Sequence, residues 1–88
     1  MEIIYTVYSL FSAIHNKIYI GYTSDLLQRF HSHNKYGTKD WTKNFRPWIV
    51  VYTEVFESKT EAINREKMLK SYRGRQFIQK ECIPQYFR

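Results

Sequence analysis

The chain has 88 residues, 43% of them hydrophobic and 18% aromatic, which predicts one small globular domain over residues 1–88 with no room for a second core. A formal net charge of +6 favours an anionic partner, with nucleic acid the commonest choice and an anionic membrane surface the alternative. Cys82 is the only cysteine, which excludes an intramolecular disulfide and fits a reducing, cytoplasmic location. The apolar run near the start is too short to span a bilayer and lacks the basic residues that begin a signal peptide, so we expect no membrane-spanning or targeting segment.

Two strands are expected at the start of the chain. Residues 3–10 are apolar on both faces, with Tyr8 on one of them, which is typical of a strand covered on both sides. Residues 17–22 are β-branched and aromatic and alternate between two faces, one of which carries Tyr19. Residues 11–16 form a short loop between these segments, which predicts an antiparallel hairpin on which Tyr8 and Tyr19 lie near each other.

A helix is expected to follow the second strand. Either Thr23 or Ser24 is suited to cap it, and Asp25 in its first turn would interact favourably with the positive end of the helix dipole. On a helical wheel, three apolar residues form a sector that should face the sheet: Leu26, Leu27 and Phe30.

Arg29 and His33 are four positions apart on this helix, so they stack along one edge of its apolar sector. In one interpretation, the two side chains only cover apolar surface and extend to solvent. In the other, they form the walls of a polar pocket together with Tyr19, above the gap that Gly21 leaves in the strand. The residues of this stretch leave both interpretations open.

Residues 34–46, NKYGTKDWTKNFR, are polar, basic and aromatic, which predicts a loop or a short irregular helix. Basic residues interleaved with aromatic residues suit the backbone and the bases of a nucleic acid. With two basic residues from a later helix, they form the expected nucleic-acid-binding set: Lys35, Lys39, Lys43, Arg46, Lys70 and Arg73.

A third strand is expected over residues 48–56. Pro47 opens this strand, and proline is tolerated at the first position of a strand. Near the end of the chain, residues 75–82 are expected to form a last short helix, with Pro84 ending regular structure.

The helix between these segments is marked at both ends. Ser58, followed three residues later by Glu61, forms a capping box that begins the helix, and Gly74 should end it. Three apolar residues mark its inward face: Ala62, Ile63 and Leu69. Glu66 points in the same direction, and a carboxylate aimed at the core requires a cation or several donors. The partner is either a nearby basic residue, such as Arg65, Arg73 or Arg29, or a divalent metal ion.

Taken together, these residues resemble the GIY-YIG nuclease superfamily. The second half of its name motif is intact as Tyr19-Ile20-Gly21, and the first half has the reduced form Thr6-Val7-Tyr8. Arg29 and His33 match the arginine of the family and the histidine or tyrosine four residues later, while Arg65-Glu66-Lys67 matches the segment with the metal-binding glutamate. Residues 42–52, TKNFRPWIVVY, resemble the third-strand region of short stand-alone members related to the catalytic domain of the UvrC repair nuclease. The resemblance spans roughly residues 3–75, and its specificity lies in the order and spacing of the whole set.

This resemblance implies a compact α/β fold, in which a central three-stranded antiparallel sheet is flanked by helices. It also implies a metal-dependent endonuclease that hydrolyses phosphodiester bonds in DNA, in repair, recombination or mobile-element processing. One Mg²⁺ or Mn²⁺ ion, held through Glu66, would polarise the phosphate. Tyr8 would act as the general base, with His33 as the second candidate for that role. Arg29 would neutralise charge on the phosphate oxygens, and Tyr19 and His33 would position the phosphate and the attacking water.

Two other functions are compatible with these residues. A catalytically inactive nucleic-acid-binding module of the same fold is the main alternative, because basic surfaces bind phosphates without cutting them. The presence of all five polar residues of the family argues against it, although each tyrosine alone is more typical of an ordinary core residue. A zinc site is the weaker alternative, since the candidate ligands lack the usual pair spacing: His15, His31, His33 and Cys82. The substrate structure and the oligomeric state stay open.

Overall fold

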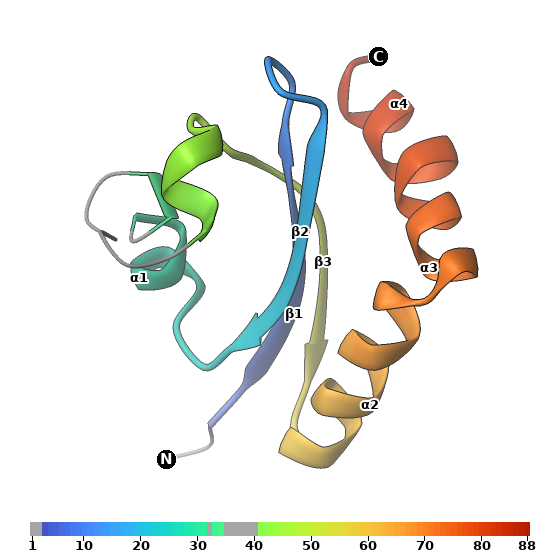
Figure 1. Ribbon diagram of the computed structural model, residues 1–88. Helices are drawn as coiled ribbons and strands as arrows, with labels where there is room; N and C mark the ends of the chain where they lie inside the picture. The colour runs from blue at the N-terminus through green and yellow to red at the C-terminus, as the bar shows by residue number, and fades with distance from the viewer. Residues whose placement is uncertain (1–2, 32, 35–40) are drawn as a thin grey trace.

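The computed structural model describes residues 3–31, 33–34 and 41–88, and a three-stranded sheet lies at its centre (Figure 1). The strands are β1 (Tyr5–Ser12), β2 (Lys17–Thr23) and β3 (Ile49–Phe56). Their order is β2-β1-β3 and both pairings are antiparallel, so β1 is the central strand. The predicted hairpin is confirmed, with strand ends shifted by one or two residues.

Helices cover both faces of the sheet (Figure 1). On one face lie α1 (Leu26–His31) and the 3₁₀ helix η2 (Trp41–Phe45). On the other face lie α2 (Lys59–Lys70), α3 (Tyr72–Phe77), the π-helix η3 (Ile78–Cys82) and α4 (Ile83–Tyr86). The expected small α/β fold is therefore confirmed. None of the helices in the described ranges is long and apolar enough to cross a membrane.

The sheet separates two apolar clusters, so the expectation of a single core is wrong. The α2-side core consists of Val7, Ile20, Ala62, Leu69, Ile78 and Cys82. The α1-side core consists of Tyr8, Leu10 and Trp48, with half-buried aromatic and aliphatic residues around it. The physical reason is the composition of β1, whose side chains are apolar on both faces and must be covered twice.

Helix α1 differs from its prediction at two points. Asp25 caps it, because its Oδ1 accepts a hydrogen bond from the Gln28 amide at 3.1 Å, while the hydroxyl of Thr23 accepts from the Asp25 amide one turn earlier. Leu27 does not face the sheet and is 69% exposed. The helix has six residues, and Leu26 and Phe30, one turn apart, both pack against the α1-side core. Leu27 is rotated by about 100° from Leu26 around the helix axis and therefore points away from that core.

The helix ends in the last third of the chain also differ from those expected from the sequence. Helix α2 ends at Lys70 with Ser71 as its C-cap, and not at Gly74. The Ser71 hydroxyl donates to the Met68 carbonyl at the end of α2 and accepts from the Gly74 amide, so Ser71 also caps the start of α3. Gly74 lies inside α3, where a Cβ atom would come within 2.4 Å of the Leu69 Cα and of the Met68 carbonyl oxygen. Pro84 does not end regular structure but lies in the first turn of α4, where a missing N–H costs nothing.

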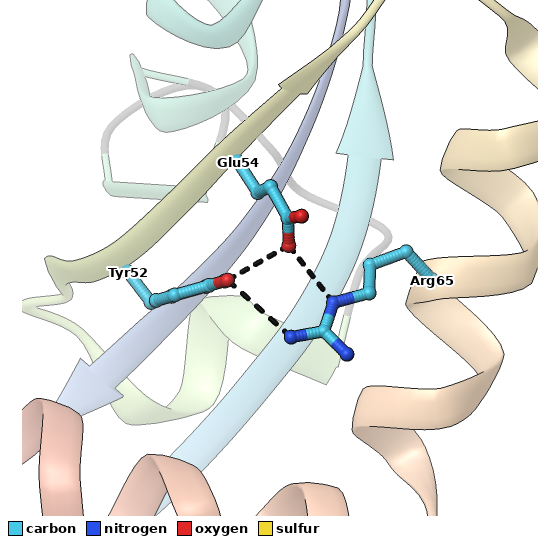
Figure 2. A network of polar contacts seen from close by, with 3 residues as sticks. All are labelled: Tyr52, Glu54 and Arg65. Atoms are coloured by element: carbon cyan, nitrogen blue, oxygen red, sulfur yellow. Dashed lines mark hydrogen bonds and ion pairs between the residues drawn. The ribbon is translucent and has the colours of Figure 1, made fainter.

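Helix α2 is joined to β3 by a network of three polar side chains (Figure 2). The Arg65 Nε donates to Glu54 Oε1 at 2.8 Å, and the Tyr52 hydroxyl donates to the same oxygen at 2.8 Å. Burial acts to raise the pKa of Glu54, but the hydrogen bonds from Tyr52 and Arg65 outweigh it and lower that pKa below 4.5. Burial raises the pKa of Tyr52, so its hydroxyl stays protonated and donates.

Replacing Gly74 by alanine tests the close approach of α3 to the end of α2. Helix propensity alone predicts that alanine adds about 1 kcal/mol of stability. The contacts with backbone atoms predict the opposite sign, a loss of about 1 to 3 kcal/mol in the free energy of unfolding, since the backbone must shift. Urea denaturation measures the difference, with Arg73→Ala, an exposed position on the same helix, as the control. A Gly74→Ala protein at least as stable as the parent would contradict the close contact.

Replacing Glu54 by glutamine tests the network between β3 and α2. Because its folded-state pKa is lowered, the Glu54 carboxylate stabilises the fold above its unfolded pKa, and this contribution is lost as the pH falls through the folded-state pKa. The side chains of Arg65 and Glu54 are 29% and 36% exposed, so solvent screening limits the effect to about 1 kcal/mol or less. The variant should be less stable at pH 7, and the difference should vanish in acid. Glu57→Gln, just beyond the same strand and outside the network, is the control, and denaturation of both variants is measured across the pH range.

Candidate active site

Four polar side chains meet on the α1 side of the sheet. A hydrogen bond of 3.1 Å joins the Tyr8 hydroxyl to His33 Nε2, and one of 2.8 Å joins His33 Nδ1 to Thr42 Oγ1. The Tyr19 ring lies beside them, with its centroid 4.6 Å from that of His33 and 6.2 Å from that of Tyr8. The expected proximity of the two tyrosines is therefore confirmed, and we call these four residues the Tyr-His cluster.

Strand pairing and a glycine explain how the two tyrosines come together. Tyr8 lies directly opposite Gly21 in the β1–β2 ladder, and Tyr19 precedes Gly21 by two positions, so all three share a face. A Cβ atom at position 21 would lie 2.9 Å from the Tyr8 hydroxyl oxygen and 3.1 Å from Tyr19 Cε1. The Tyr8 hydroxyl therefore occupies the gap that the glycine leaves, as the sequence pattern indicates.

His33 is held in the interior by its neighbours along the chain. Only 1% of its surface is exposed. Its carbonyl oxygen accepts a hydrogen bond from Arg46 Nε, and the amide of Asn34 pairs with both backbone groups of Trp48, at 2.6 and 3.0 Å. The Trp48 indole N–H donates to the Thr42 carbonyl at 2.8 Å, so Trp48 also fixes the second partner of the histidine.

The two hydrogen bonds of His33 define what the cluster can do chemically. When the proton of the neutral imidazole lies on Nδ1, it is donated to Thr42, and Nε2 accepts the hydroxyl proton of Tyr8. In the other tautomer, Nε2 donates to Tyr8 and the Thr42 hydroxyl donates to Nδ1. The first arrangement gives Tyr8 a base to which its own proton can move, because Nε2 then has a free lone pair that accepts the hydrogen bond from the hydroxyl.

Arg29 and Glu66 lie apart from this cluster. Arg29 is exposed on α1, and it has no side-chain hydrogen bond or ion pair with the part of the chain that the structure describes. Glu66 lies on α2, which covers the other face of the sheet, and its side chain is 16% exposed. Its partner is Lys70 at 3.1 Å and none of the expected arginines, because Lys70 is one turn away and Arg65 is engaged by Glu54.

A divalent metal ion fits Glu66 only in part. Within residues 3–31, 33–34 and 41–88, no three His, Cys, Asp or Glu side chains are grouped as a metal cluster. Mg²⁺ is commonly bound through one or two carboxylates, with waters and substrate phosphates completing its coordination. A half-buried carboxylate with one lysine as partner suits such a site, in which the substrate supplies the remaining oxygen ligands.

The expected nucleic-acid-binding residues are divided between the two faces. Lys43 is exposed on η2, whereas Arg46 is half-buried and tied to the His33 carbonyl. On the other face, Lys70 pairs with Glu66 and Arg73 is exposed on α3. Lys35 and Lys39 lie outside the described residues.

The structure does not bring together the candidate zinc ligands. His15 is exposed in the hairpin loop beside the Phe45 ring, and His31 is half-buried beside Phe30. His33 belongs to the Tyr-His cluster, and Cys82 is buried in the α2-side core on the opposite face of the sheet, where burial raises the pKa of its thiol. The zinc alternative is therefore wrong for these residues.

Thr42 is the member of the cluster that sequence reasoning missed. It lies nine residues after His33, beyond a connection without periodicity, and a threonine among basic and aromatic residues carries no signal of burial. Asn34 and Trp48 were likewise assigned no role, although their pairing fixes the position of the histidine.

Comparisons with known proteins identify the family of the chain. Residues 4–80 match the family described as the GIY-YIG catalytic domain. The UPF0213 protein of Staphylococcus haemolyticus is 39% identical over 61 residues, which are 69% of this chain and 74% of that protein. A UPF0213 protein of Staphylococcus aureus is 40% identical over 55 residues, which are 62% of this chain and 67% of that protein.

A solved structure is similar over most of the chain. The solution NMR structure of a UPF0213 protein from Bacillus halodurans superposes with a TM-score of 0.55 at 30% identity, and the match covers 92% of this chain and 88% of that one. With the family match, the fold and the paired tyrosines all in agreement, the chain belongs to the GIY-YIG nuclease superfamily, as a small member similar to the UPF0213 proteins.

Proposed function

We propose that the protein is a divalent-metal-dependent endonuclease that hydrolyses phosphodiester bonds in DNA. The observation that carries this proposal is the hydrogen-bonded chain from Tyr8 through His33 to Thr42, beside Tyr19, in a member of a nuclease superfamily. A buried tyrosine hydroxyl requires a hydrogen-bond partner in any protein, and a histidine in that place is also a base, which suits the pair to proton transfer.

Tyr8 and His33 would act as a proton relay. A tyrosine in water has a pKa near 10 and is a poor base at neutral pH when it must ionise first. Here the hydroxyl can take a proton from the attacking water while its own proton moves to His33 Nε2. The hydroxide forms the new bond to phosphorus as the bond to the 3′ oxygen breaks, and Thr42 holds the imidazole in the required tautomer.

The other family residues would bind and orient the phosphate. Arg29, exposed on α1, would neutralise charge that develops on the non-bridging oxygens, and Tyr19 would position the phosphate beside the cluster. Glu66, together with phosphate oxygens, would hold the metal ion. When bound, Mg²⁺ or Mn²⁺ supplies charge stabilisation to the phosphate and to the leaving oxygen.

An inactive nucleic-acid-binding module is the second candidate, and two observations favour it. Tyr8 and His33 are 2% and 1% exposed, so neither ring is open to a substrate in this conformation. Glu66 is paired with Lys70 on the opposite side of the sheet from these rings. Under this reading, the hydrogen bonds of His33 only satisfy a buried polar group.

Cleavage assays with a Glu66→Gln variant test the nuclease proposal. A panel of branched, single-stranded and duplex DNA and RNA is incubated with Mg²⁺, Mn²⁺ or EDTA. We expect cleavage by the parent in metal and none in EDTA, and loss of cleavage in Glu66→Gln with far-UV CD and nucleic-acid binding retained. Glu61→Gln, an exposed position on the same helix, is the control. Undiminished cutting by Glu66→Gln would reject Glu66 as the metal ligand, and a parent that binds but cuts nothing would favour the inactive module.

Single-turnover rates of a Tyr8→Phe variant test the proton relay. Loss of this hydroxyl should lower the rate by about 10² to 10⁴ and leave substrate affinity unchanged. The variant also removes the buried hydrogen bond to His33 Nε2, at a cost of about 1 to 3 kcal/mol, so its stability is measured in parallel. Tyr22→Phe, on the same hairpin but packed against the α2-side core, should cut at the parental rate. A Tyr8→Phe protein that does the same would remove Tyr8 as the base and leave His33 as the candidate.

A further inference from the structure

A pocket of about 490 Å³ opens at the outer edge of β2. Its polar lining comes from the start of the strand and from the helical layer behind it: Asn16, Lys17, Tyr19, Lys70, Arg75 and Gln79. We propose that this pocket, which we call the β2-edge pocket, binds a phosphate of the nucleic acid strand next to the one that is cleaved. The inference deepens the proposed function and rests on it for the identity of the ligand.

Among the residues that line the pocket, Arg75 is the one whose guanidinium is already oriented for a phosphate contact. Its Nε donates to the Lys70 carbonyl oxygen at 3.2 Å, and its backbone amide is fixed by the Ser71 carbonyl at 2.9 Å. Among the residues that the structure describes, its two terminal amino groups have no hydrogen-bond partner. A guanidinium held by its Nε loses little freedom when the remaining donors bind the two oxygens of a phosphate.

The charges around the pocket favour an anion. Lys17 and Lys70 add two cations to Arg75, and Glu66, the ion-pair partner of Lys70, is the carboxylate tied to this group. Lys17 is held with its ammonium 5.5 Å from the centre of the Phe45 ring, and the Lys70 side chain is 48% exposed. The amides of Asn16 and Gln79 supply neutral donors, so the lining suits an oxyanion such as phosphate.

Tyr19 connects the pocket to the Tyr-His cluster. The same residue lines the pocket and packs its ring against His33, with the ring centroids 4.6 Å apart. Lys70 makes a similar connection to Glu66, with which it pairs at 3.1 Å. A strand whose phosphate lies on Arg75 is therefore next to Tyr19, the ring neighbour of His33, and next to Lys70, the partner of Glu66.

Arg73 provides a natural contrast to Arg75. The two arginines flank Gly74 on α3, carry the same charge and are both exposed. Arg73 lines a different, largely apolar hollow together with Met68 and Phe77, on the other side of the helix corner. The pocket thus assigns this phosphate contact to Arg75, which lies outside the expected nucleic-acid-binding set, and not to Arg73.

A titration observed by NMR tests the pocket without any cleavage. The ¹⁵N-labelled protein is titrated with inorganic phosphate, with sodium chloride at equal ionic strength as the control. We expect a saturable shift of the Arg75 Nε–H resonance and of the Gln79 side-chain amide with phosphate and not with chloride. Equal responses to both salts, or a response confined to other residues, would overturn the assignment of the pocket.

Two arginine variants then test whether nucleic acid uses the pocket. Binding of a labelled single-stranded oligonucleotide is measured by anisotropy over a range of salt concentrations for Arg75→Ala, Arg75→Lys and, as the matched control, Arg73→Ala. Arg75→Ala should lower the slope of log K against log salt by about one, whereas Arg73→Ala should leave it unchanged. Arg75→Lys keeps the charge, so it should restore the slope but bind more weakly than the parent, which separates a lost contact from a lost fold.

The oligonucleotide is used with and without a 5′ phosphate, which distinguishes a terminal phosphate from an internal phosphodiester as the ligand. Equal affinity supports an internal phosphodiester, and tighter binding of the phosphorylated strand supports a terminal one. If Arg75→Ala and Arg73→Ala both bind the oligonucleotide as tightly as the parent does, the pocket inference fails while the nuclease proposal stands. If the parent binds no nucleic acid, the proposed function fails, and the titration with inorganic phosphate alone decides whether the pocket is an anion site.

Discussion

A buried imidazole carries two ring nitrogens, and each requires a hydrogen-bond partner inside the protein. His33 finds these partners on the central strand, in Tyr8, and on a 3₁₀ helix, in Thr42, so three segments distant in sequence must meet at one point. Trp48 completes the arrangement, because its indole N–H holds the Thr42 carbonyl and its backbone pairs with Asn34. Any change that removes one of these hydrogen bonds from the interior is expected to cost about 1 to 3 kcal/mol.

The part of the site that lies on the hairpin could be predicted from the sequence, because strand alternation depends only on local spacing. Tyr8 and Tyr19 share a face as soon as the two strands pair, and Gly21 is opposite Tyr8 in the same register. The individual strands and helices follow from equally local signals, whereas the three-stranded antiparallel sheet flanked by helices is an implication of the family resemblance. The capping box at Ser58 is one of these local signals, since the hydroxyl accepts the Glu61 amide at the start of α2.

The remaining contacts could not be predicted, since they depend on where distant segments pack. Several arginines and lysines are close enough in sequence to pair with Glu66, and Lys70 is the partner because Arg65 is bound to Glu54 on β3. Gly74 resembled a helix end, but the constraint on it is the backbone of α2 that approaches it from the previous turn. In both cases the sequence indicated correctly that the residue is constrained, but tertiary contacts determine which residue pairs with Glu66 and why position 74 is a glycine.

Strand β1 pairs with β2, which is close to it in sequence, and with β3, which is distant in sequence, and this difference affects the order of folding. Its pairing with β2 closes only a short turn, whereas its pairing with β3 joins Tyr5 to Phe56 and Phe11 to Ile49, which requires closure of a much longer loop. The segments that carry His33 and Thr42 lie within that loop. The hairpin can therefore form first with both tyrosines in place, and their polar partners arrive only when β3 docks. Conversely, local detachment of β3 would dismantle the cluster while the hairpin persists, so the backbone amides near Thr42 should exchange with solvent before those that pair β1 with β2.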